Sequence, residues 1–163
     1  MENSENEYKK YLDMGIFDIQ DGKYDCAISN INKSLELKND WEIPYFYRAV
    51  AYQAMENFDE AMLDYTKSLQ LNPKMTDAYY NRARIILTRK DIQCPDIQAA
   101  VADLEQALKL DEKFIDALYA MAAAQKKLGN YVLAIEYLDK LLEIEPEAVN
   151  AKALKKLILQ KYM

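Results

Sequence analysis

The feature that constrains this chain most is a repeat of about 34 residues that recurs four times. One column of alanines marks the repeat, with spacings of 34, 39 and 34 residues: Ala27, Ala61, Ala100 and Ala134. A second column of small residues lies earlier in each unit, with spacings of 34, 34 and 39: Gly15, Ala49, Ala83 and Ala122. Self-similarity at a fixed period of this size indicates an array of stacked repeats.

Within each unit the apolar residues follow helical spacing. In the second unit Ala61, Tyr65 and Leu69 step by four residues, which places them on one face of a helix. Pro73 and Pro146 stand just past leucine-rich segments, where proline stops helices. Small residues are needed where two paired helices approach closely. We therefore predict an all-α fold in which each unit is a helix, a turn and a second helix.

The 39-residue spacing shows that the third unit carries five extra residues between its two small columns. We assign them to the segment 89–96, which contains Cys94 and Pro95. Because insertions in turns disturb no packing, we interpret this segment as one lengthened turn.

The recurring columns resemble the tetratricopeptide repeat family. The second unit carries the clearest match, in the runs PYFYRAVAY, NFDEAM and KSLQLNP. Asn39 and Glu112 stand where the family has its terminal proline, and Leu118 replaces the early aromatic residue of the fourth unit. The resemblance covers residues 8–148 and implies a right-handed superhelical solenoid.

The resemblance also implies the boundaries of the array. We expect one domain over residues 1–163, with four repeats at about 8–41, 42–75, 76–114 and 115–148. After Pro146 the columns stop, although the segment 147–162 still has helical spacing. We predict a capping helix there, because the last repeat of a solenoid needs a polar outer face.

Two arginines occupy a position that should lie close to the buried side of the first helix. Arg48 and Arg82 directly precede the early small column, and Asp64 and Asp103 follow the later alanine by three residues in the same two units. The first and fourth units have neither the arginine nor the aspartate. A partly buried guanidinium is best matched by a carboxylate, so we predict two structural ion pairs, Arg48 with Asp64 and Arg82 with Asp103.

The composition argues against catalysis. The chain has no histidine, which removes the commonest general base and metal ligand, and it contains neither glycine-rich phosphate-binding motif. The acidic residues are scattered over helical positions that are typical of solvated surfaces. We expect no enzymatic activity, no catalytic residues, no cofactor and no metal.

The charge and the apolar pattern limit which partners and which cellular compartment we expect. A net charge of −6 and a pI of about 4.8 oppose nucleic-acid binding, including by the RNA-reading pentatricopeptide class of similar period. No apolar stretch approaches the roughly 20 residues that cross a bilayer, and the acidic start is unlike a signal peptide.

Cys26 and Cys94 form no CxxC motif, and we predict two buried or half-buried free thiols. We expect a cytoplasmic protein with no membrane contact.

In the tetratricopeptide repeat family one arc of the first helices lines a concave groove for ligands, and we carry that arc over position by position. Here the arc is rich in apolar and aromatic residues, which is typical of an interaction surface. The predicted groove residues are Leu12, Ile16, Phe46, Tyr47, Val50, Tyr80, Asn81, Arg84, Tyr119 and Lys126. Arg84 could anchor a peptide carboxylate or could instead be a solvated arginine over Tyr80. Any one apolar member could also complete the core.

Some members of the family clamp the acidic C-terminal tails of chaperones with lysine, asparagine and arginine side chains. The matching positions here are Leu12, Ile16, Tyr47, Asp77 and Asn81. None has the side chain that the clamp requires, so we predict no clamp of that type.

The sequence thus predicts a non-catalytic scaffold or adaptor that binds a protein or peptide in its groove. The alternative is a structural subunit that self-associates, as a homo-oligomer, through the apolar groove or the solenoid ends. The ends differ in charge: residues 1–25 carry seven acidic and three basic residues, and residues 147–163 carry one acidic and four basic residues.

Overall fold

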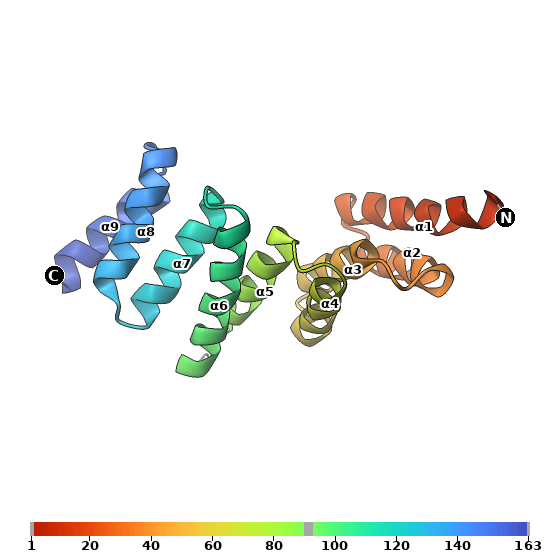
Figure 1. Cartoon of the computed structure of the whole chain (residues 1–163), viewed down its shortest axis with the longest axis horizontal. Helices are drawn as coiled ribbons and strands as arrows, with labels where there is room; N and C mark the ends of the chain where they lie inside the picture. The colour runs from red at the N-terminus through yellow and green to blue at the C-terminus, as the bar shows by residue number, and fades with distance from the viewer. Residues whose placement is uncertain (1, 90–92, 163) are drawn as a thin grey trace. The chain divides into compact units, whose positions relative to one another are not determined.

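The computed structural model describes residues 2–89 and 93–162, and every regular element within them is an α-helix (Figure 1). The helices follow one another as α1 (Glu2–Gln20), α2 (Tyr24–Leu37), α3 (Glu42–Ala54), α4 (Phe58–Leu71), α5 (Thr76–Thr88), α6 (Cys94–Leu110), α7 (Ile115–Lys127), α8 (Tyr131–Ile144) and α9 (Val149–Tyr162). The predicted all-α fold of four helix–turn–helix repeats is confirmed, with α9 at the place of the predicted cap.

The helices form two compact units, Met1–Ala78 and Tyr79–Met163. In the first unit α1 packs against α2 and α3 against α4, while α2 also contacts α3. In the second unit α7 packs against α8, and α6 contacts α7 as α8 contacts α9. Packing within each unit therefore runs both inside a repeat and between consecutive repeats, as in other repeat proteins. The assignment of the whole chain to one domain stays a prediction.

The early small column lies where the two helices of a repeat meet. Ala49, Ala83 and Ala122 are all 0% exposed, and Gly15 is buried. A Cβ atom added to Gly15 would stand 2.5 Å from Cγ1 of Ile31 on α2. The close approach of α1 and α2 therefore leaves no space for a side chain at this position.

Each unit has its own buried cluster. In the first unit Leu12, Ile31 and Leu35 form the cluster, and Trp41 and Tyr47 pack against it. In the second unit the cluster is built from α7, α8 and α9, and its buried members are Leu118, Ala122, Ala134, Leu138, Leu141, Ala151 and Ile158. Burial of these apolar side chains between consecutive helices supplies the main stabilising free energy of each unit.

The inserted residues of the third repeat are only partly a turn. The other second helices begin three residues before their marker alanine, whereas α6 begins six residues before it, at Cys94. The backbone N–H of Gln93 donates to Oδ2 of Asp96 at 3.0 Å, and Pro95 lies in the first turn, where its missing N–H breaks no helical hydrogen bond. Three of the five extra residues thus lengthen α6, and the prediction of a single long turn is wrong for them. Residues 90–92 lie outside the described part of the chain.

The two cysteines have different outcomes. Cys26 is exposed on α2, so the prediction of a buried or half-buried thiol is wrong there. The reason is rotational: Ala27 faces the core with 0% exposure, and the preceding residue points about 100° away from it around the helix. The side chain of Cys94 is not among those that the structure describes.

Candidate functional site

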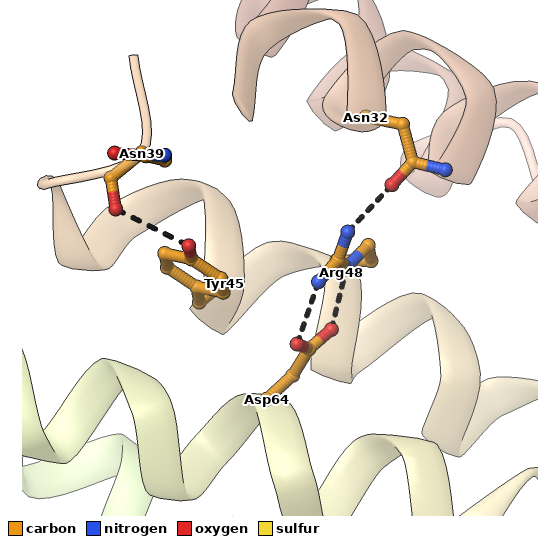
Figure 2. Close-up of polar contacts among 5 residues, drawn as sticks. All are labelled: Asn32, Asn39, Tyr45, Arg48 and Asp64. Atoms are coloured by element: carbon orange, nitrogen blue, oxygen red, sulfur yellow. Dashed lines mark hydrogen bonds and ion pairs between the residues drawn. The ribbon is translucent and has the colours of Figure 1, made fainter. Parts of the chain in front are cut away.

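Arg48 on α3 connects three helices (Figure 2). Its Nε and Nη2 donate to Oδ2 and Oδ1 of Asp64 on α4, at 2.6 and 2.8 Å. Its Nη1 donates to Oδ1 of Asn32 on α2, at 2.6 Å, and Cζ lies 5.6 Å from the ring centroid of Tyr45. The predicted ion pair is confirmed, and the bond to Asn32, which the sequence did not indicate, extends it into the preceding repeat.

Arg82 repeats the arrangement between α5 and α6. Its Nε and Nη2 donate to Oδ2 and Oδ1 of Asp103, at 2.8 and 2.6 Å, and Cζ lies 5.9 Å from the ring centroid of Tyr79. The second predicted pair is confirmed as well. Both arginines are therefore held by a carboxylate fork on one side and a tyrosine ring on the other.

Electrostatics and burial are consistent with a structural role for both pairs. Burial alone would lower the pKa of Arg48, but the hydrogen bonds and the charge of Asp64 outweigh it and raise that pKa. The hydrogen bond to Asp103 is the main cause that raises the pKa of Arg82. Both guanidinium groups stay cationic across the physiological range, with their charges satisfied inside the fold.

One predicted groove residue of the first unit is not accessible. Leu12 is 3% exposed and belongs to the buried cluster with Ile31 and Leu35. The prediction that Leu12 lines a groove is wrong because α2 and α3 both pack against α1, and the cluster around Leu12 draws its members from those helices.

The other four groove residues of the first unit keep part of their surface. Ile16, Phe46, Tyr47 and Val50 are all half-buried. Ile16 and Tyr47 pack against the Leu12 cluster, and the ring of Phe46 meets that of Tyr47 edge-on, with centroids 5.4 Å apart. We call these four apolar side chains the α1–α3 surface, and Ile16 and Tyr47 connect it to the buried cluster.

The groove residues of the second unit are more accessible and more polar. Tyr80, Asn81 and Lys126 are half-buried, whereas Arg84 and Tyr119 are exposed. Cζ of Arg84 lies 5.7 Å from the ring centroid of Tyr80. This contact is the one expected of a solvated arginine that lies over Tyr80. We call these five residues on α5 and α7 the α5–α7 surface.

Two aromatic residues that the groove prediction omitted extend these surfaces. Phe114 lies 5.1 Å from Tyr80, ring centroid to ring centroid, and Trp41 lies 5.5 Å from Tyr8 in the same sense. Both residues directly precede a first helix, α7 and α3, and both stand eight residues before the early small column. That shared position was the signal that could have found them.

Other kinds of site find no support in the described residues. In residues 2–89 and 93–162 no group of three or more cysteine, aspartate or glutamate side chains is arranged to hold a metal ion. No described helix combines the length and the apolar character that crossing a membrane requires.

Helix pairs that meet at small residues, with partly apolar first-helix surfaces, define a helical-repeat protein of the protein-binding kind. Two stretches of the chain match known families: residues 44–75 match "Tetratricopeptide repeat", and residues 115–162 match "Fis1 C-terminal tetratricopeptide repeat". The chain belongs to the tetratricopeptide repeat proteins.

Similar proteins agree with this assignment. Human "Tetratricopeptide repeat protein 12" is 35% identical over 91 residues, which are 56% of this chain and 12% of that protein. The matched region spans only 10% to 27% of the lengths of the curated relatives.

Solved structures show the same fold. The crystal structure of MamA has a TM-score of 0.82 at 22% identity, covering 90% of this chain and 83% of that one. The structure "First TPR of Spaghetti (RPAP3) bound to HSP90 peptide SRMEEVD" has a TM-score of 0.67 at 23% identity, covering 73% and 90%.

Proposed function

We propose that this chain is a non-catalytic scaffold that binds a protein or peptide against its first helices, on the α1–α3 surface and on the α5–α7 surface. The observation that carries the proposal is the set of aromatic side chains there that remain accessible: Phe46, Tyr47, Tyr80 and Tyr119. Aromatic side chains on rigid helices bury large areas at a small entropic cost, and they dominate the free energy of many protein interfaces.

The polar residues of the α5–α7 surface suggest the chemistry of the ligand. Arg84 and Lys126 are cationic, and Asn81, three residues before Arg84 on α5, offers both a donor and an acceptor. A ligand that combines an apolar side chain with a carboxylate would suit this surface, since the guanidinium of Arg84 already lies over Tyr80. The net charge of −6 supports a protein ligand over a nucleic acid.

We further propose that acidic chaperone tails are not bound in the manner of the clamp described above. The peptide in the RPAP3 structure, SRMEEVD, is acidic. Of the positions that would have to supply the clamp, Leu12 is buried and Asp77 is an exposed carboxylate. An acidic tail would therefore meet a like charge where the clamp has a cation, which lowers its affinity.

The test is a peptide selection on the full chain, followed by titration of the selected peptides. The Tyr80→Ala, Arg84→Ala double variant should weaken binding at the α5–α7 surface by about tenfold or more, and Phe46→Ala should do so at the α1–α3 surface. The matched control is Leu63→Ala, because Leu63 is 72% exposed on the second helix α4. Equal affinity of the selected peptides for all these variants would reject the proposal.

The clamp is tested in the same titration with the peptide SRMEEVD as probe. We expect no saturable binding of this peptide by the wild-type chain. Binding that is lost in an Asn81→Ala variant would show that the clamp exists here in some form, and it would overturn this part of the proposal.

A further inference from the structure

The first helix α1 exposes a side that the equivalent helices bury. In α9 the place of the early small column is taken by Lys156, seven residues after the start of the helix. The residue two places after this column is 0% exposed in α3, α7 and α9, where it is Ala51, Ala124 and Ile158. The residue at this position in α1 is Phe17, which is 60% exposed. A large aromatic side chain thus stands in water at a position that is otherwise part of a helix–helix contact.

A second position shows the same contrast. The residue five places before the small column is buried in α3, α7 and α9, where it is Pro44, Ala117 and Ala151. In α1 it is Lys10, which is exposed. In those three helices this side faces the preceding second helix, because α2 packs on α3, α6 on α7 and α8 on α9.

The exposed side of α1 has a defined chemical order. Phe17 and Met14, which is 43% exposed, line an open depression together with four charged residues. Lys9 and Lys10 lie on the N-terminal side of Met14 and Asp18 on its C-terminal side, with Asp13 directly before Met14. We call these six residues the α1 outer side.

This order is complementary to itself when the direction of the helix is reversed. Two antiparallel copies of α1, related by a two-fold axis near Met14, bring Lys10 of each copy close to Asp18 of the other. The apolar residues of the two copies then meet at the centre, and the opposed helix dipoles attract one another. A parallel arrangement would instead place each lysine and each aspartate beside its own counterpart. The antiparallel arrangement does so only near the axis, at Asp13, which is exposed and can stay solvated.

We propose that the α1 outer side is a self-association surface on which a second copy of this chain docks through its own α1, antiparallel and with two-fold symmetry. Such an isologous contact uses the same residues on both copies, and it covers Phe17 and Met14 as second helices cover the corresponding residues elsewhere. The proposal does not depend on ligand binding to the surfaces described above, because Phe17, Met14, Lys10 and Asp18 belong to neither of them.

The first test measures the mass of the full chain by sedimentation equilibrium over a concentration series. The wild type should form a dimer, and Phe17→Lys should raise the dimer dissociation constant by about tenfold or more. Because Phe17 is 60% exposed, the variant should keep its helical circular dichroism. The control Val132→Lys, at a residue that is 61% exposed on α8, should dimerise like the wild type. A wild type that stays monomeric, or a Phe17→Lys variant that dimerises unchanged, would overturn the proposal.

The second test reverses the charges. Lys10→Glu and Asp18→Lys should each weaken the dimer, and the double variant should restore it, because both opposed pairs are then rebuilt with exchanged signs. Asp18 also accepts a hydrogen bond from Nδ2 of Asn30 at 2.8 Å, so Asn30→Ala measures the effect of losing that bond alone. Single variants without effect, or a double variant that stays dissociated, would rule out the antiparallel docking.

Discussion

Replacing Arg48 by methionine should destabilise the folded chain substantially, although methionine stands at the same position in the first and fourth repeats. The change keeps an unbranched apolar stem and removes the guanidinium with its bonds to Asp64 and Asn32. The carboxylate of Asp64, whose side chain is 9% exposed, is then left without its cation. The cost should therefore exceed that of an ordinary surface substitution.

The magnitude follows from the burial of the pair. Removing one partner of a fully buried ion pair costs about 3–5 kcal/mol. The side chain of Arg48 is 21% exposed, so water can enter and solvate part of what the substitution leaves behind. We expect the free energy of unfolding to fall by about 2–3 kcal/mol, close to the loss of one or two hydrogen bonds to charged groups.

A double-mutant cycle separates the pair from its surroundings. Arg48→Met combined with Asp64→Asn reproduces the residues of the first repeat, Met14 and Asn30. The double variant should lose less stability than the two single variants added together, with a coupling free energy of about 1–3 kcal/mol. Urea denaturation followed by circular dichroism measures each free energy of unfolding, provided that the slopes agree between variants.

The control cycle uses Lys152 and Glu147, which are 3.1 Å apart, Nζ to Oε2, with side chains that are 51% and 90% exposed. An exposed pair of this kind should couple by less than about 0.5 kcal/mol. If the Arg48–Asp64 coupling were equally small, the argument that this pair fastens α3 to α4 would be refuted.

Three further predictions concern packing, pH and reactivity. Gly15→Ala should destabilise the chain by about 1 kcal/mol or more in urea denaturation, since the contact with Ile31 outweighs the better helix propensity of alanine; no loss, or a loss that is no smaller in an Ile31→Ala background, would contradict this. Burial is the main cause that raises the pKa of Tyr137. The protonated side chain therefore contributes its full share to the stability of the folded state below about pH 10, and this stabilisation is lost as the pH rises through the pKa of the folded state. Tyr137→Phe should therefore flatten the alkaline loss of stability, and an unchanged pH profile would count against it. Cys26 should react with a thiol reagent in the native state, and one equivalent of label should disappear in Cys26→Ser.

The fold could be predicted because the four repeats of the chain can be aligned with one another. Four copies of one pattern show which positions stay small or apolar, and this indicates helix pairs without any other sequence. The Arg48–Asp64 and Arg82–Asp103 pairs were predictable for the same reason, since arginine and aspartate occur together in two repeats and are absent together from the others.

The candidate site was less predictable. Helical spacing shows on which side of a helix a residue lies, but it does not show which other segment packs against that side. Leu12 lies on the predicted arc, yet α2 and α3 both pack against α1 and Leu12 joins their buried cluster. Phe114 was omitted because the arc was drawn within the helices, and this residue stands just before α7. In both cases the missing information was the position of a neighbouring segment.

The last helix, α9, and the first helix, α1, differ in the residues that they hold at the repeat positions. Lys155 on α9 stands directly before the small column, as Arg48 does, and its Nζ donates to Oδ1 of Asp139 on α8. Asp139 follows its marker alanine by five residues, as Asn32 does, so α9 uses the same pair of positions as α3 to contact the preceding repeat.

The other side of α9 is unsuited to the packing of a further helix. Lys152 and Lys156 take the places of the early aromatic and the small residue, and both are exposed. A second helix cannot pack closely against two lysines without desolvating them. The helix α1 has the opposite pattern, because Gly15 admits its own partner α2 while Phe17, on the side that would face a preceding repeat, is apolar and uncovered. Self-association is expected through α1 because complementary charges, Lys10 and Asp18, flank its uncovered apolar residues. In α9, by contrast, the exposed Leu157 directly follows Lys156.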